Sequence, residues 1–313
     1  MNNYQKKVKE AREEFLKVMA NQEKELVKIY VEASKIIEDK LKRAPSGGIT
    51  ERYYKALKVS LDRYVKELRK ELKSNIENNI DKVSNIATEI QTSFFDQIAP
   101  TLKLKQSFES MFTQISKDTV KRMLEGKYYS DGKTLDDRLW ILTSKNAKDI
   151  ERLITLNMAS GTNARELAKL LDRYINPKKI LLKRNMADKI DKHISYQAAR
   201  LARTSLTHAY SETLIEDTMK NPFSTGLKWN TSPAHYERQI KKYGEDMCTW
   251  NNGKVFKPKT IPLQHPNCLC YFTVETVPVE EARKELVAWV NGKEDKVLDS
   301  WLNKYGKEYG IEV

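Results

Sequence analysis

The chain has 313 residues, 32% of them charged, and a formal net charge of +13. This length is enough for two or three domains. The chain contains no apolar run of the roughly 18 residues that a membrane helix needs, so we expect no membrane partner. Its three cysteines are an odd number, and all lie between Cys248 and Cys270. This pattern argues against a disulfide framework and favours synthesis in a reducing cytoplasm.

The first hundred residues are predicted to form two long helices. Apolar residues recur every three or four positions from Tyr4 to Leu41, and again from Leu57 to Phe94. Pro45 and the two glycines that follow it interrupt the pattern, so residues 1–100 should form an antiparallel helical hairpin. The second helix, ~70 Å long at 1.5 Å per residue, is too long for a compact domain to cover. Neither stripe can stay in water, so the pair should pack on each other, on the next domain or on another protein. We expect the uncovered part of the stripes to form a protruding stalk or a partner-binding arm.

Residues 101–222 are predicted to form a helical middle domain. One helix should end near Gly126, and the next should be anchored by Leu139, Trp140 and Leu142. A third helix should end at Pro177, and a long helix should follow it.

The middle domain contains a strongly basic segment. From Arg173 to Arg203 there are nine Lys or Arg residues and two Asp residues, a net charge of +7. Such a cluster suits a polyanion, because phosphate contacts require no sequence code. The alternative is a solvated helix surface. The residues predicted to contact DNA phosphates are Lys178, Lys179, Lys183, Arg184 and Lys189.

Residues 223–313 are predicted to form a small α+β domain. Segments rich in β-formers lie among glycines and prolines, and two helices close the chain. Asn252-Gly253 predicts a hairpin turn with Trp250 and Phe256 as flanking core residues, and Trp229 should also be a core residue. The expected fold class is mainly α with a small α+β C-terminal domain and a long N-terminal helical hairpin.

The stretch "IPLQHPNCLCYFT" contains two cysteines and one histidine, and it could therefore contribute to a metal-binding site. Cys248, His265, Cys268 and Cys270 offer the four ligands that a tetrahedral zinc site needs. However, a C-x-C pair on a strand would point to opposite faces, and no C-x-x-C pair is present. We therefore expect no metal and no cofactor, with zinc as the alternative. The residues predicted to close the fold are Trp229, Gly253, Phe256, His265, Pro266, Asn267, Cys268 and Cys270.

Known catalytic patterns are missing. The sequence has no glycine-rich phosphate loop, no nucleophile elbow and no histidine pair at zinc-protease spacing. An enzyme could still use His235, His265 and Cys248 if they converged in one open cleft, whereas a structural domain would bury them separately. A regulatory DNA-binding protein is a third interpretation, but no helix-turn-helix is recognisable.

Four segments together resemble a known family. They are "ARLARTSLTHAYSE", "LKWNTSPAHYER", "GEDMCTWNNGKVF" and "PLQHPNCLCYF". In this order they resemble the Mu F-like domain of phage head morphogenesis proteins, also called minor head or minor capsid proteins. "DGKTLDDRLW" and "SGTNARELAKLLDRYINP" look like the helical region before that domain. Two departures from the family are Asn251, where many members complete a C-x-x-C, and Ser205, where many have Glu.

The resemblance implies a non-catalytic minor head protein. Such a protein is attached to the portal vertex inside the capsid. The expected partner is the portal protein, with scaffolding or major capsid protein as further candidates. It would bind double-stranded DNA without sequence preference and assist head assembly, DNA packaging or delivery. Its expected location is the virion interior, after a period in the host cytoplasm. The alternative is an enzyme, nuclease or toxin-like, that is packaged in the head and delivered with the DNA.

Overall fold

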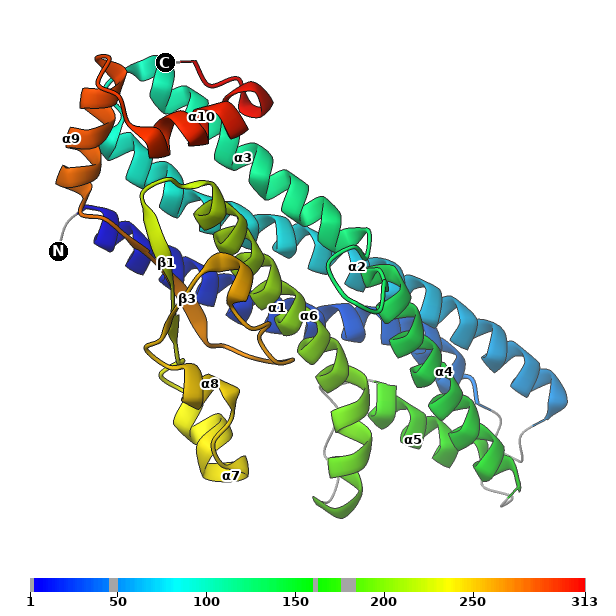
Figure 1. Cartoon of the computed structure of the whole chain (residues 1–313). Coiled ribbons are helices and arrows are strands. Elements are labelled where there is room, and N and C mark those ends of the chain that lie inside the picture. The colour runs from blue at the N-terminus through cyan, green and yellow to red at the C-terminus, as the bar shows by residue number, and fades with distance from the viewer. Residues whose placement is uncertain (1–2, 45–49, 160–162, 176–183, 313) are drawn as a thin grey trace. The chain divides into compact units, whose positions relative to one another are not determined.

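The computed structural model describes residues 3–44, 50–159, 163–175 and 184–312. Helices dominate, and a small antiparallel sheet lies near the C-terminus, so the predicted fold class is confirmed (Figure 1). In the described ranges, none of the helices combines the length and apolar character needed to cross a membrane.

The long helices come first in the chain. They are α1 (Asn3–Lys42), α2 (Glu51–Ile98), α3 (Leu102–Leu124), α4 (Leu135–Ala159), α5 (Ala164–Ile175) and α6 (Arg184–Lys220). The C-terminal third holds β1 (Ser224–Asn230), a π-helical turn (Tyr236–Ile240), α7 (Lys241–Tyr243), α8 (Met247–Asn251), β2 (Val255–Phe256), a 3-10 turn (Pro258–Thr260), β3 (Tyr271–Thr276), α9 (Val279–Val290) and α10 (Lys296–Tyr309).

The chain divides into two compact units. Unit 1 comprises Met1–Val18, Asn79–Met123 and Arg203–Val313, and unit 2 comprises Met19–Asn78 and Leu124–Ala202. The divisions fall inside α1, α2 and α6, so each of these helices supplies residues to both units.

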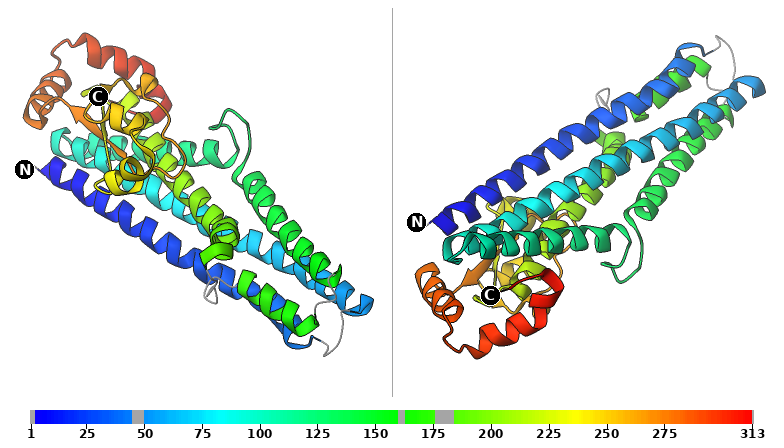
Figure 2. Two further views of the ribbon diagram at one scale, coloured as in Figure 1. Left: turned by 90° about the horizontal axis from the view of Figure 1, so that it is seen from below. Right: turned by 90° about the horizontal axis from the view of Figure 1, so that it is seen from above.

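The apolar stripes of α1 and α2 are buried within the chain. In unit 2 the two helices lie side by side, and the Tyr53 hydroxyl donates to the Lys40 carbonyl at 3.1 Å (Figure 2). Tyr30 is fully buried beside Asn146 of α4 and Tyr174 of α5, and burial raises the pKa of its phenol. The prediction of uncovered stripes is therefore wrong, because helices later in the chain cover them. Buried stripe residues are Tyr4, Ala11, Phe15, Met19, Leu26, Ala33, Ile37, Leu41, Leu57, Leu61, Tyr64, Leu68, Leu72, Ile76, Ile80, Val83, Ile90 and Phe94.

Aromatic side chains form the centre of unit 1. The Phe95 ring lies 4.0 Å from that of Phe108 and 6.3 Å from that of Phe223, measured between centroids. Trp301 of α10 extends this cluster at 5.7 Å from Phe108, and its indole N–H donates to the Lys220 carbonyl at 2.7 Å. These contacts join α2, α3, the end of α6 and the C-terminal helix in one core.

The sheet has strand order β2-β1-β3, and both pairs are antiparallel. Trp229 of β1 lies opposite Phe272 of β3, and Trp229 is fully buried as predicted. The register between β1 and β3 shifts at Gly226, which has a φ of +150°. A Cβ atom there would lie 2.7 Å from the Phe256 carbonyl oxygen, so only glycine fits.

Asn252-Gly253 ends a helix and does not connect two strands. Asp246 caps α8 at its N-terminus, Asn252 caps its C-terminus, and Gly253 follows with a φ of +81°. Helix ends and tight hairpins both require a left-handed glycine, so the dipeptide alone could not distinguish them. The predicted core role of Trp250 is wrong, since its side chain is 61% exposed, and Phe256 is half-buried.

Candidate functional site

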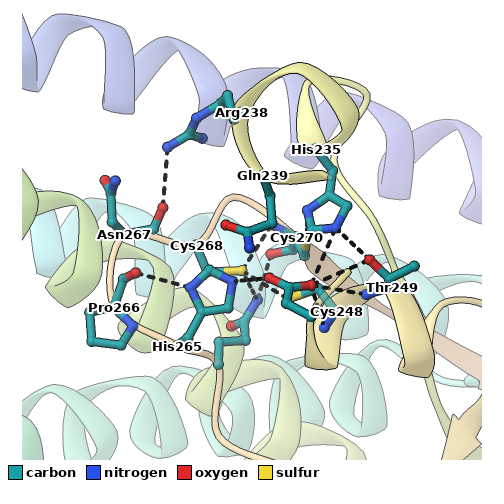
Figure 3. Close-up of polar contacts among 12 residues, drawn as sticks. His235, Arg238, Gln239, Cys248, Thr249, His265, Pro266, Asn267, Cys268 and Cys270 are labelled. Atoms are coloured by element: carbon teal, nitrogen blue, oxygen red, sulfur yellow. Dashed lines mark hydrogen bonds and ion pairs between the residues drawn. The ribbon is translucent and has the colours of Figure 1, made fainter. Parts of the chain in front are cut away.

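The three cysteines lie together in unit 1. Cys248 is on α8, whereas Cys268 and Cys270 are in the segment before β3. The Sγ atoms of Cys248 and Cys268 are 3.6 Å apart, and all three sulfurs lie within 4.8 Å of one another. Their exposed fractions are 0, 2 and 2%, and all three thiols are free. We call these three residues the thiol cluster (Figure 3).

Cys268 and Cys270 do not point to opposite faces, so the sequence-based argument against convergence is wrong. Both precede β3, and Asn267 adopts a left-handed φ of 66°. The Cys268 N–H donates to the His265 carbonyl at 3.2 Å, which closes a turn. The Cys270 N–H then donates to the Cys268 sulfur at 3.3 Å. The backbone thus turns around the Cys268 sulfur. Residues 268 and 270 are not in a strand, so their side chains need not follow the alternation of strand residues.

Helix α6 holds this turn in place. The Thr204 hydroxyl oxygen accepts from the Asn267 N–H at 2.9 Å, and the Thr207 hydroxyl donates to the Cys268 carbonyl at 3.0 Å. The Arg203 guanidinium also donates to the Asn267 side-chain oxygen. The basic and hydroxyl residues of α6 therefore fix the position of two sulfurs.

Gln264 is a buried residue of the site that the sequence analysis missed. Its amide donates to the Cys270 carbonyl at 2.5 Å, and its side-chain oxygen accepts from the Ser211 hydroxyl at 2.6 Å. Its own carbonyl lies 2.9 Å from Nε2 of His208. The available signal was the group of polar residues at 207, 208 and 211 on one turn of a helix that otherwise buries alanine and leucine.

Asp246 lies between two histidines. Its Oδ1 accepts from the backbone N–H groups of Cys248 and Thr249 at 3.0 and 3.2 Å, as an N-cap does. The same oxygen is 3.3 Å from Nε2 of His235, and Oδ2 is 3.3 Å from Nε2 of His265. The carboxylate thus links the helix cap to both imidazoles.

The two imidazoles differ in their second nitrogen. His235 places Nε2 3.0 Å from the Thr249 hydroxyl and Nδ1 3.7 Å from the Cys270 sulfur. His265 places Nδ1 3.0 Å from the carbonyl oxygen of Pro266. A carbonyl can only accept, so Nδ1 of His265 carries a proton. The Nε2 atom is buried and faces Oδ2 of Asp246 at 3.3 Å.

The protonation of the thiol cluster is shared among its members. Hydrogen bonds with Cys268 and Cys270, together with burial, raise the pKa of Cys248. The same sulfurs donate to Cys270 and lower its pKa, against the opposing effect of burial.

Arg12 brings a positive charge to the thiol cluster from α1. Its guanidinium donates to the Leu269 carbonyl at 2.7 Å and lies 4.2 Å from the centroid of the Tyr271 ring. Burial lowers the pKa of Arg12, while negative charge on Cys268 or Cys270 would raise it. Among the described residues, no carboxylate forms an ion pair with Arg12.

The residues predicted to contact DNA lie outside the part of the chain whose side chains the structure describes. Lys178, Lys179 and Lys183 lie outside the described residues, and Arg184 and Lys189 belong to α6 with side chains that also lie outside them.

A basic groove is present in unit 2. It is lined on α2 by Lys66, Lys70 and Lys73 and on α4 by Trp140, and also by Asp62 and by Asp136, which pairs with Arg69 and lies 3.9 Å from Lys73. Trp140 is 55% exposed, so its predicted role as a core anchor is wrong, whereas the adjacent Leu139 is buried. Basic side chains beside an exposed indole are suited to a nucleic-acid backbone and its bases.

Chemically, the site in unit 1 can bind a soft divalent cation. A thiol nucleophile would need an approach for its substrate, which buried sulfurs do not offer. A scan against protein-family models, a search of curated proteins and a search of solved structures returned no match for this chain.

Proposed function

We propose that this chain is a non-catalytic minor head protein of a phage, with a Mu F-like domain, which associates with the portal vertex and binds double-stranded DNA without sequence preference. One observation carries the proposal: the segments on which the resemblance rests contact one another in unit 1. Arg238, for example, donates to the Asn267 carbonyl at 3.2 Å. In unit 1 these segments comprise residues 203–212, 227–238, 244–256 and 262–272.

Charge supports the DNA-binding part of the proposal. The net charge of +13 is concentrated in the basic segment, and the groove in unit 2 adds further lysines. Binding through phosphates releases condensed counterions, so affinity should fall steeply as salt rises and should depend little on sequence.

The test is the salt dependence of binding to random-sequence double-stranded DNA. Replacing Lys178, Lys179, Lys183 and Arg184 by Ala should lower affinity and reduce the slope of log K against log salt by about 0.9 for each lost phosphate contact. Replacing the groove lysines 66, 70 and 73 should have a smaller effect of the same kind. A matched control replaces the exposed lysines 24, 28 and 35 of α1. An unchanged slope in the four-residue variant would contradict the assignment.

Portal association needs a separate experiment. We expect the full chain to enter proheads that contain portal protein and to be missing from proheads assembled without it. Equal incorporation into both would favour scaffolding or major capsid protein as the partner, against the portal.

One observation favours the enzyme alternative. His235, His265, Asp246 and Cys248 do converge, contrary to the expectation that a structural domain would bury them separately. The thiol of Cys248 is fully buried and His235 is buried, however, so the sulfur does not line an open cleft, whereas His265 and Asp246 are half-buried. Nuclease activity in the purified protein that is lost in His265→Ala would establish the enzyme and contradict our proposal.

A further inference from the structure

We propose that Cys248, Cys268, Cys270 and His265 bind one structural Zn²⁺ ion, which staples α8 to the turn before β3. This inference goes beyond the proposed function, because neither portal association nor DNA binding requires a metal. It replaces the sequence-based expectation that the cysteines only fill the core.

The sulfur positions fit zinc. In a tetrahedral site with Zn–S bonds of about 2.3 Å, two sulfurs are separated by about 3.8 Å. The Cys248 and Cys268 sulfurs are 3.6 Å apart, and the third sulfur lies within 4.8 Å of both. A disulfide would require about 2.05 Å, and it would leave the third thiol without a role.

The N–H groups around the cluster also suit thiolate ligands. The Cys270 N–H and the Gln264 amide are directed at the Cys268 sulfur, at 3.3 and 4.0 Å. Outer hydrogen bonds of this kind orient metal ligands and reduce their excess negative charge.

His265 provides the fourth ligand. Its Nδ1–H donates to a backbone carbonyl, the usual support of a metal-binding imidazole, and this leaves Nε2 as the donor atom. Nε2 lies within 4.8 Å of the Cys248 sulfur and an Asp246 oxygen, so Cys248 belongs both to this group and to the thiol cluster. In the neutral tautomer, Nε2 and the Asp246 oxygen would present lone pairs to each other at 3.3 Å, and a divalent cation bound to Nε2 would remove that repulsion.

His235 is a positioning residue in this proposal. Its Nε2 lies 3.0 Å from the Thr249 hydroxyl and 3.3 Å from Asp246, and its Nδ1 lies 3.7 Å from the Cys270 sulfur. With the proton on Nδ1 it donates to the Cys270 thiolate and accepts from the Thr249 hydroxyl, whereas His265 contacts the metal.

Arg12 brings a compensating positive charge to the cysteine side of the site, while the carboxylate of Asp246 lies on the histidine side. Zinc with three thiolates and one neutral imidazole carries one net negative charge. Such a charge is costly to bury alone, and the guanidinium of Arg12 lies beside Cys268 and Cys270 with no carboxylate to pair with among the described residues. The proposal thus also explains a buried cation that the free thiols leave without a counter-charge.

The first experiment measures metal and thiols in the untagged, full-length protein. We expect one zinc per chain, released as a mercurial reagent titrates three thiols, and a thiolate-to-cobalt charge-transfer band after Co²⁺ exchange. Protein without zinc, whether with three free thiols or with a disulfide, would overturn the proposal. Because wild-type protein is used, this result does not depend on any variant folding, and it leaves the DNA and portal tests unaffected.

Variants then assign the ligands. Cys268→Ser should abolish the stoichiometric zinc. His265→Asn should weaken zinc binding by more than about 100-fold, whereas His235→Asn should cost about tenfold, as loss of an outer partner does. The reverse order of the two histidine variants would overturn the assignment of His265 as a ligand.

Discussion

At the scale of single residues, Trp229 shows how one side chain organises the small sheet. It is among the largest fully buried side chains, and its ring lies 5.0 Å from Phe272 and 6.4 Å from Phe256 between centroids. Its indole N–H has no hydrogen-bond partner among the described residues. The ring therefore stabilises the sheet through apolar contact, while the N–H imposes a cost.

This balance predicts different effects for two substitutions. Trp229→Ala should lower the free energy of unfolding by about 3–5 kcal/mol through the cavity it leaves. Trp229→Phe should cost less than about 2 kcal/mol, because it keeps a ring and removes the unpaired donor. Urea denaturation followed by circular dichroism measures both. Equal losses in the two variants would show that the indole N–H makes a favourable contact.

At the scale of elements, α2 and α6 meet in unit 1 through a buried polar seam. Asn221 donates to the Gln91 side-chain oxygen at 2.8 Å, and both carboxylate oxygens of Asp217 are buried without a hydrogen-bond partner in the described structure. Other buried side-chain atoms without partners belong to Ser84, Thr88 and Thr213. Helical periodicity marks only the apolar residues of such an interface, so the seam was not predicted.

Asp217 should make stability depend on pH. Burial raises the pKa of its carboxyl well above the ordinary value, with a smaller opposing effect of Lys220. The pKa of Asp217 is higher in the folded state than in the unfolded state, where it is about 3.9. Proton binding to Asp217 therefore stabilises the folded state fully below a pH of about 3.9. This stabilisation is lost as the pH rises through the folded-state pKa. Asp217→Asn should therefore be more stable than wild type at pH 7, because it removes the cost of a buried charge.

The difference in unfolding free energy between wild type and Asp217→Asn should shrink as the pH falls towards about 4. Denaturation curves of both proteins at several pH values measure it. A difference that is constant with pH would contradict the buried-acid assignment.

At the scale of the whole molecule, α1 and α2 are part of the core. Phe15 and Phe94 are buried in the core of unit 1, and Tyr30 and Leu68 are buried in the core of unit 2. Deleting Met1–Pro100 should therefore prevent folding and not merely remove a docking arm. We expect aggregated protein without near-ultraviolet circular dichroism, compared with the full chain. A truncated chain that unfolds cooperatively would contradict this prediction.

Sequence alone determined the features that depend on local periodicity and composition. The stripes from Tyr4 to Phe94 predicted two long helices, and β-formers after Pro222 predicted the small sheet, because a buried face requires apolar side chains at a fixed spacing. The core position of Trp229 was also predictable.

Only the tertiary structure determined which residues that are distant in the sequence are in contact. The exposure of Trp140 and Trp250 and the cover over the hairpin depend on segments distant in the chain. The arrangement of the site depends even more strongly on contacts between segments that are far apart in the sequence. Asp246, the histidines and the cysteines converge because a left-handed Asn267 and the hydroxyls of α6 fold a turn towards α8. The sequence lists the residues of the site. Their convergence is a property of the folded chain, because it depends on contacts between segments that are far apart in the sequence.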